Sequence, residues 1–191
     1  MSHKPVIIPP LLSDTIVNGI LSIDNMSFTH TTKYCNKCGG VLSPYDTKKK
    51  VYATIYNSDG TDRQIMVYIR RYKCSTCTKL TYADEPFYPK TRIGSAIIDL
   101  ARTLSSEYSY SHASEIINKI GIKMDRSSVR KYSLLNLPNP KINFFYGLPI
   151  PESVSSLISM AFEFKAGTVT DTKVIEALGN PSNIKNSVIS K

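Results

Sequence analysis

Two Cys-x-x-Cys pairs constrain this chain more than any other feature of its sequence. Cys35 and Cys38 form the first pair, Cys74 and Cys77 form the second, and the chain has no other cysteine. Zinc prefers four soft ligands in a tetrahedron, and each Cys-x-x-Cys turn presents two sulfurs close together. We therefore predict a structural zinc site with all four cysteines as ligands, which leaves no open coordination position for catalysis.

The residues alone leave other uses of these cysteines open. A disulfide framework needs an oxidising compartment, and the N-terminus MSHKPVIIPPLL has no signal-peptide pattern. A thioredoxin-like redox pair needs a βαβ context, which we do not find in the sequence. An iron–sulfur cluster is also held by four thiolates. His30 and His112 could act as ligands too, although four cysteines suffice for one zinc ion.

The 35 residues between the cysteine pairs contain two strand-like runs, VYATIY and IMVYIRRY. Apolar and polar residues alternate in both runs, and the turn-forming NSDGTD lies between them. This period of two predicts a β-hairpin that brings the cysteine pairs together as a zinc ribbon. Tyrosines such as Tyr52 and Tyr72 could stack on bases, but we expect them to cover a small domain.

From Thr91 onward the apolar period becomes that of a helix. Residues 93–105 predict a first helix, a second ends before Gly121, and Asp125 is the predicted N-cap of a third. Two prolines in NLPNPK end the third helix, because proline cannot continue it. A three-helix unit of this kind can place its last helix in the major groove of DNA.

The polar residues on the last helix and before it are the candidate DNA contacts. Arginine can bind guanine edges through two hydrogen bonds, whereas serine and lysine bind bases or phosphates. Lysines in and before the turn would contact the DNA backbone. The predicted DNA-binding residues are Lys119, Lys123, Arg126, Ser127, Ser128, Arg130 and Lys131.

The charge of the chain agrees with a nucleic-acid partner. The formal net charge is +9, to which residues 31–85 contribute +5 and residues 86–135 contribute +4. A basic region of this kind is typical of proteins that bind phosphate backbones. No stretch is long and apolar enough to span a bilayer. We therefore expect a cytoplasmic protein whose partner is double-stranded DNA and not a membrane. The sequence does not indicate its oligomeric state.

The segment EIINKIGIKMDRSSVRKY resembles the helix-turn-helix of insertion-sequence transposases. Ile116, Ile120, Gly121, Ile122 and Val129 match the pattern of that family, whereas an isoleucine follows Ile116 where a small alanine is usual. In prokaryotic and particularly archaeal transposases of this type, a zinc ribbon often precedes the helix-turn-helix. The resemblance covers residues 33–137 and implies sequence-specific binding to duplex DNA and a role in DNA recombination.

The family also implies an RNase H-like catalytic domain with three carboxylates, which needs far more than the 54 residues after Leu137. Asp171, in GTVTDTKVI, resembles the context of the first carboxylate, but one carboxylate cannot hold two metal ions. We predict no catalytic residues and expect a shortened or remodelled transposase-like protein. Two alternatives are a zinc-ribbon module that docks on a protein complex and an active nuclease with an unrecognised carboxylate cluster.

These inferences combine into an α+β fold built from small units. Residues 1–30 are expected to form a loosely packed N-terminal arm, residues 31–85 the zinc ribbon and residues 90–137 the helix-turn-helix domain. Residues 84–89 would link the two domains. Residues 138–191 are expected to be a weakly defined C-terminal segment, with one apolar helix at residues 153–164, and would be the remnant of a longer protein.

Overall fold

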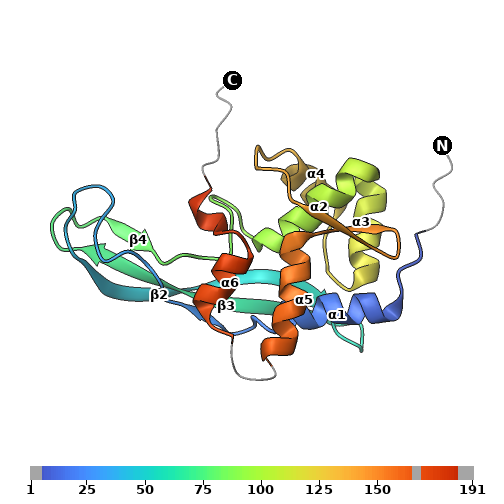
Figure 1. Ribbon diagram of the computed structural model, residues 1–191, viewed down its shortest axis with the longest axis horizontal. Coiled ribbons are helices and arrows are strands. Elements are labelled where there is room, and N and C mark those ends of the chain that lie inside the picture. Colours follow the sequence, from blue (N-terminus) through green and yellow to red (C-terminus); the bar gives the residue numbers. More distant parts are fainter. Residues whose placement is uncertain (1–5, 165–168, 185–191) are drawn as a thin grey trace.

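The computed structural model describes residues 6–164 and 169–184, and these residues form the mixed α+β fold that the sequence predicts. A four-stranded sheet contains β1 to β4, and a two-stranded sheet contains β5 and β6. In Figure 1 the β2–β3 hairpin extends from one side of a group of helices. The elements are α1 (Pro10–Leu21), β1 (Ser27–Phe28), β2 (Leu42–Tyr56), β3 (Asp62–Cys74), β4 (Leu80–Tyr82), α2 (Ser95–Glu107), α3 (Tyr110–Ile120), α4 (Arg126–Ser133), β5 (Ile142–Phe145), β6 (Leu148–Pro151), α5 (Glu152–Phe164), α6 (Asp171–Ala177) and a 3-10 turn, Pro181–Asn183.

The predicted hairpin is confirmed and is longer than the two runs that indicated it. β2 pairs antiparallel with β3 from Tyr56 opposite Asp62 to Leu42 opposite Cys74. The register shifts at two points of β2, between residues 44 and 46 and between residues 51 and 53. β1 and β4 pair with β3, β1 in parallel and β4 antiparallel, so β3 is the central strand of the sheet.

The three predicted helices form, and the first of them, α2, begins and ends two residues later than the predicted range 93–105. α3 ends at Gly121, whose φ of 107° lies in the left-handed region that favours glycine. α4 begins after Asp125, whose carboxylate accepts a hydrogen bond from the backbone N–H of Ser128 at 2.8 Å. α2, α3 and α4 contact one another pairwise, and their shared apolar face buries residues such as Ile116 and Val129.

The hairpin and the helices are joined by backbone hydrogen bonds and by one continuous apolar core. The N–H of Gly94, before α2, donates to the carbonyl of Tyr52 in β2 at 2.8 Å. The turn between α3 and α4 pairs with the end of β2: the N–H of Tyr56 donates to Gly121 at 2.9 Å, and the N–H of Lys123 donates to Thr54 at 2.8 Å. The end of the hairpin where residues 57–61 connect β2 to β3, which we call its root, is therefore fixed to the α3–α4 turn.

Residues 84–89 are more than the linker that we predicted. Phe87 and Tyr88 are buried in the main core. The Tyr88 hydroxyl donates to the carboxylate of Asp99 in α2 at 2.8 Å, and the Ser153 hydroxyl of α5 donates to the same carboxylate at 2.8 Å. Burial raises the pKa of Asp99 above its usual value, although the two hydrogen bonds act in the opposite direction. This buried polar contact ties the segment to two helices.

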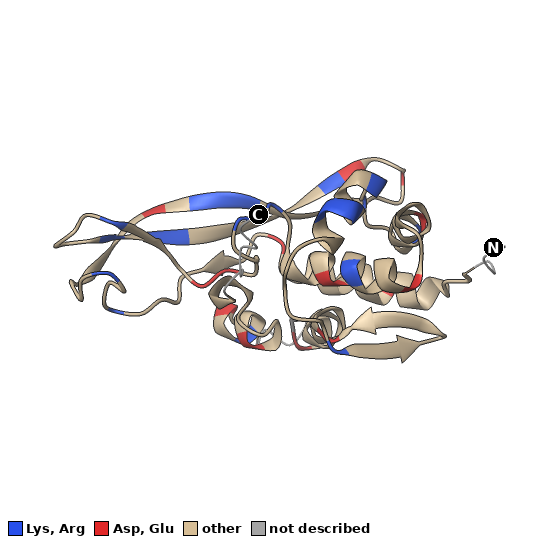
Figure 2. Ribbon diagram, turned by 90° about the horizontal axis from the view of Figure 1, so that it is seen from above, with Lys and Arg blue, Asp and Glu red and all other residues tan. Residues whose placement is uncertain are grey.

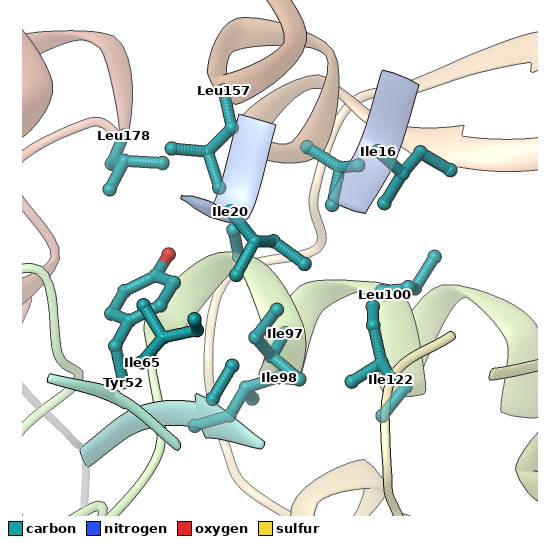
Figure 3. Close-up of a cluster of buried hydrophobic side chains, with 14 of the residues drawn as sticks. Ile16, Ile20, Tyr52, Ile65, Ile97, Ile98, Leu100, Ile122, Leu157 and Leu178 are labelled. Atoms are coloured by element: carbon teal, nitrogen blue, oxygen red, sulfur yellow. The ribbon is translucent and has the colours of Figure 1, made fainter. Parts of the chain in front are cut away.

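The N-terminal segment is not a loosely packed arm. α1 lies against α5, and its residues Leu12, Ile16 and Ile20 are buried in the main core. Figure 3 shows Ile16, Ile20 and Leu157 in one cluster with apolar residues of α2 and the hairpin. The expectation failed because the apolar face of α1 is covered by a helix that lies more than a hundred residues later in the sequence.

The C-terminal segment is also better defined than we expected. The predicted helix at residues 153–164 is confirmed as α5, and β5 and β6 form an antiparallel pair before it. Ile150, Val154 and Val174 are buried in the same core as the hairpin and the helices. Asp171 begins α6 and accepts a hydrogen bond from the backbone N–H of Thr29 at 2.8 Å, so it joins α6 to β1. Residues 165–168 and 185–191 lie outside the described part of the chain.

Within the described residues, none of the helices combines the length and the apolar character that crossing a membrane requires.

Replacing Gly19 tests whether α1 is docked. The Cβ of an alanine there would lie 2.8 Å from the carbonyl carbon of Leu157 and 2.9 Å from the backbone N of Ile158. In a loose helix, Gly19→Ala would stabilise the protein by about 1 kcal/mol through helix propensity. Because the new Cβ meets backbone of α5, we expect a loss of about 1–3 kcal/mol in the free energy of unfolding, measured by chemical denaturation.

Asn18→Ala, on the exposed side of the same helix, is the matched control. This substitution raises helix propensity without meeting α5, so it should leave stability unchanged or slightly raise it. A gain in stability for both variants would contradict the docking of α1.

Candidate functional site

The structure brings the four predicted metal ligands together at the end of the hairpin farthest from the helices. The ligand sulfurs of Cys35, Cys38, Cys74 and Cys77 all lie within 4.8 Å of one another. The Sγ atoms of Cys35 and Cys77 are 3.8 Å apart, and those of Cys38 and Cys74 are 3.4 Å apart. A tetrahedral site with metal–sulfur bonds of about 2.3 Å places its sulfurs roughly 3.8 Å apart. The quartet could therefore hold one metal ion.

The four cysteines are free thiols, and their separations agree with ligation better than with disulfide bonding. A disulfide bond brings two sulfurs to about 2.05 Å. The predicted alternatives at His30 and His112 are not part of the quartet: His30 lies 3.9 Å from Asp84, and His112 lies 3.4 Å from Glu115. Within residues 6–164 and 169–184, the cysteine quartet is the one group of side chains found to be arranged for metal binding.

The two cysteine turns have the same backbone geometry. In the first, Gly39 N–H donates to the carbonyl of Cys35 at 2.9 Å; in the second, Thr78 N–H donates to the carbonyl of Cys74 at 3.1 Å. Gly39 and Thr78 both have positive φ, 71° and 57°. Glycine adopts this conformation freely, but a β-branched residue does so at a cost. The two turns are therefore equivalent, and the second one contains a strained residue.

Gly40 is required by the close approach of the two turns. The Cβ of an alanine at this position would lie 2.4 Å from Oγ1 of Thr76 and 2.9 Å from Sγ of Cys74. Backbone N–H groups also point at the buried sulfurs: Lys37 N lies 3.5 Å from Sγ of Cys35, and Thr76 N lies 3.4 Å from Sγ of Cys74. Such N–H groups stabilise thiolates.

These surroundings separate the acidities of the thiols. The backbone N–H of Cys77, with further help from Thr76, lowers the pKa of Cys74 to about 6. The N–H of Lys37 lowers the pKa of Cys35. At Cys38 the N–H of Gly40 acts in the same direction, but the neighbouring thiols and burial outweigh it and raise the pKa to about 11. Because the thiolate is the ligand, metal binding by the quartet must release protons and weaken as the pH falls.

The predicted DNA-binding residues lie around the α3–α4 turn and along α4. Lys119, Arg126, Arg130 and Lys131 are exposed, and Lys131 extends over the ring of Tyr132, 5.4 Å from its centroid. In Figure 2 the basic residues of α4 and those of the hairpin lie along the same edge of the molecule. The structure thus gathers the predicted arginines on one exposed helix face.

Three of the predicted contacts already have partners within the chain. Lys123 forms an ion pair with Asp62 of β3. The hydroxyls of Ser127 and Ser128 donate to the Asp125 carboxylate at 2.5 Å and 2.9 Å. The Ser127 hydroxyl and then the Ser128 N–H lower the pKa of Asp125 to about 2, so the N-cap remains charged. The serines therefore complete the cap of α4, a role that the N-cap prediction at Asp125 could have indicated.

The tyrosines of the hairpin act as expected, as structural residues. Tyr52 is fully buried, and the hydroxyls of Tyr56 and Tyr72 donate to Asn118 and to the carbonyl of Thr29. The predicted DNA contacts did not include the lysines and arginines of residues 31–50 and 70–80, the part of the hairpin next to the cysteines. The net charge of residues 31–85 does not reveal this cluster, because four of the five acidic residues of that range lie outside residues 31–50 and 70–80.

A pair of opposite substitutions tests the equivalence of the two cysteine turns. Thr78→Gly should stabilise the metal-bound hairpin by about 1 kcal/mol, because it removes a left-handed β-branched residue. Gly39→Thr should destabilise it by a similar amount for the same reason. Retention of metal against a competing chelator measures both effects. Changes of the same sign in the two variants would contradict the backbone assignment.

Comparisons of this chain with protein-family models, with curated proteins and with solved structures found no match. What the protein does must therefore be inferred from its own residues. Two features carry chemistry. One is the cysteine quartet at the open end of the hairpin, far from the helices, and the other is the basic surface that runs from the hairpin to α4.

Proposed function

We propose that this protein is a zinc-containing, sequence-specific binder of double-stranded DNA, related in kind to the N-terminal region of insertion-sequence transposases. The observation that carries the proposal is the arrangement of α2, α3 and α4: three helices in mutual contact, a glycine turn before the last of them, and exposed arginines on that last helix. A helix-turn-helix that reads the major groove has this composition.

Zinc is the metal that the cysteine quartet favours most. Four thiolates that all lie within 4.8 Å of one another, with two of the pairs 3.4 Å and 3.8 Å apart, suit a tetrahedral, redox-inactive ion. Soft thiolate sets also accept iron–sulfur clusters and Cu(I), so metal analysis must decide among them. With four protein ligands the ion has no open position, and its role is structural: it fixes the start of β2 to the end of β3.

α4 has the residues that a recognition helix needs. Arg126 and Arg130 lie one helical turn apart on its exposed side, where either guanidinium can donate two hydrogen bonds to a guanine edge. Lys119 lies at the end of α3, where it would bind a phosphate next to the groove. Lys123 would leave its ion pair with Asp62 to bind a phosphate. Breaking that pair costs little free energy, because the pair is exposed to solvent.

A protein-docking module is the second candidate, and exposed aromatic residues favour it. Phe144 in β5 and Tyr146 in the following turn are 72% and 70% exposed, and Phe162 of α5 is 66% exposed. Exposed apolar patches often mark protein contacts. These residues belong to β5, to the turn after it and to α5, and none of them is part of α4. DNA cleavage is not part of the proposal.

Metal removal tests the structural role of zinc. The purified chain should contain about one zinc ion, lose it as the pH falls and lack it when Cys74 is replaced by alanine. Cys35, Leu42 and Cys74 form a small apolar cluster apart from the main core, so chelation should loosen the distal hairpin and leave the helices folded. Limited proteolysis should then cut near residues 33–48 and 71–80, while helical circular dichroism is retained.

Cys74→Ala provides the control, because its cleavage pattern should not change further on chelation. A chain that is free of metal as isolated, or whose hairpin resists proteolysis equally with and without chelator, would refute the structural role of zinc.

Two pairs of substitutions in α4 test base reading. Arg126→Ala with Arg130→Ala should lose sequence preference, by about 1–3 kcal/mol for each base contact removed. Arg126→Lys with Arg130→Lys keeps the charge but not the bidentate geometry, so this variant should retain non-specific affinity and still lose preference. Binding to a selected duplex and to a random duplex, measured by fluorescence anisotropy, separates the two effects. Unchanged preference in the alanine variant would exclude α4 as the recognition helix.

A further inference from the structure

The distal part of the hairpin carries most of the excess charge of the chain. We define the distal hairpin as residues 31–50 and 70–80, which hold the cysteine turns and the strand segments next to them. This region has nine basic residues and one acidic residue, Asp46, against a net charge of +9 for the whole chain. The basic residues are Lys33, Lys37, Lys48, Lys49, Lys50, Arg70, Arg71, Lys73 and Lys79.

Several of these cations have no carboxylate partner. Lys50 pairs with Glu85 at 2.5 Å, and Arg71 pairs with Asp46. Among the described residues, no carboxylate lies within ion-pair distance of Lys48, Lys49, Arg70 or Lys73. The lysines lie beside tyrosine rings instead; the ammonium of Lys49, for example, is 5.9 Å from the ring centroid of Tyr68. These lysines therefore lie beside aromatic rings of the sheet and have no ion-pair partner among the described residues.

One face of the distal hairpin points to the same side as the α3–α4 turn. Lys49 lies opposite Tyr68, and Thr47 lies opposite Arg70, so all four side chains share a face. Asp62 binds Lys123 of the turn. Arg70 lies eight positions after Asp62 in β3, and the bulges of the hairpin are on β2. Side chains alternate along a strand, so the two residues lie on the same face apart from the strand twist.

The spacing suits one duplex that contacts both regions. Arg70 is eight residues from Asp62 in β3, which is roughly 26 Å at about 3.3 Å per residue. One turn of B-DNA is about 34–36 Å long. In Figure 2 the hairpin and α4 follow one edge of the molecule, whereas α5, α6 and the β5–β6 pair follow the opposite edge. A duplex along the first edge would meet both basic regions within one turn.

We propose that the distal hairpin binds the phosphate backbone of the duplex next to the site read by α4, within about one helical turn of it. This inference rests on the proposed function. The hairpin root is hydrogen-bonded to the α3–α4 turn at Gly121 and Lys123, so hairpin and α4 meet the DNA as one unit. A metal ion bound by the cysteine quartet would support this contact from a distance, because it would hold the ends of both charged strands together.

Salt dependence of binding measures the proposed contacts. The full chain is titrated into a fluorescein-labelled random duplex of forty base pairs at several salt concentrations. Lys49→Ala with Arg70→Ala should lower the slope of log affinity against log salt by about 2, because each phosphate contact contributes about 0.9. Lys141→Ala with Lys173→Ala is the control, since it removes the same charge from ion-paired lysines elsewhere. Lys49→Arg with Arg70→Lys should keep the wild-type slope.

Each outcome decides between the two proposals. If wild-type protein fails to bind the duplex at low salt, both the proposed function and this inference are wrong. If wild type binds and the two alanine variants have equal slopes, the distal hairpin does not contact DNA, and the function of α4 stands. Wild-type protein could instead bind a forty-nucleotide single strand more tightly than the duplex. If the variant with Lys49→Ala and Arg70→Ala loses that binding, single-stranded nucleic acid is the partner of the hairpin and the duplex contact is wrong. Equal zinc content and equal unfolding curves show that the variants are folded.

Discussion

The antiparallel pairing of β2 with β3 is the interaction on which the rest of the molecule depends. The pairing starts at Tyr56 opposite Asp62, beside the helices, and ends at Leu42 opposite Cys74, beside the other three cysteines. Cys74 lies twelve positions after Asp62 in β3, so the two ends are roughly 40 Å apart at about 3.3 Å per residue. A pair of strands thus separates the two sites while it fixes their relative orientation.

The two ends of this pair are stabilised by different means. At the root, Ile65 and Val67 of β3 are fully buried in the core shared with α1, α2 and α5. At the cysteine end, the buried apolar cluster of the described residues is Cys35, Leu42 and Cys74, with Tyr72 and Cys77 packed against it. This is too little apolar surface to hold two turns together. A metal ion bound by four thiolates can supply the missing stability there, since structural zinc contributes folding free energy directly.

Local signals in the sequence predicted the parts of this fold that form from neighbouring residues. The period-2 runs gave the hairpin, Gly121 the end of α3 and Asp125 the start of α4. The sequence did not show that α1 packs against α5 or that Phe87 and Tyr88 are buried, because those contacts join distant segments. The cysteine quartet was predictable, since its spacing and the hairpin together bring the ligands to one end. Zinc binding by the quartet and DNA binding by α4 stay predictions.

The register of the hairpin also explains how so much positive charge is tolerated on two strands. Lys48 lies opposite Ile69, Lys49 opposite Tyr68 and Arg71 opposite Asp46, so no cation of this segment directly faces another. Like charges in direct opposition destabilise a sheet, and a slip by one residue would place Lys48 opposite Arg70. The register shifts at both ends of the segment and the closed turn at the root favour the observed pairing. The strand register therefore spreads the cations over the surface. Lys50 and Arg71 have carboxylate partners there. The other cations of the two strands can be approached by a polyanion such as a phosphate backbone.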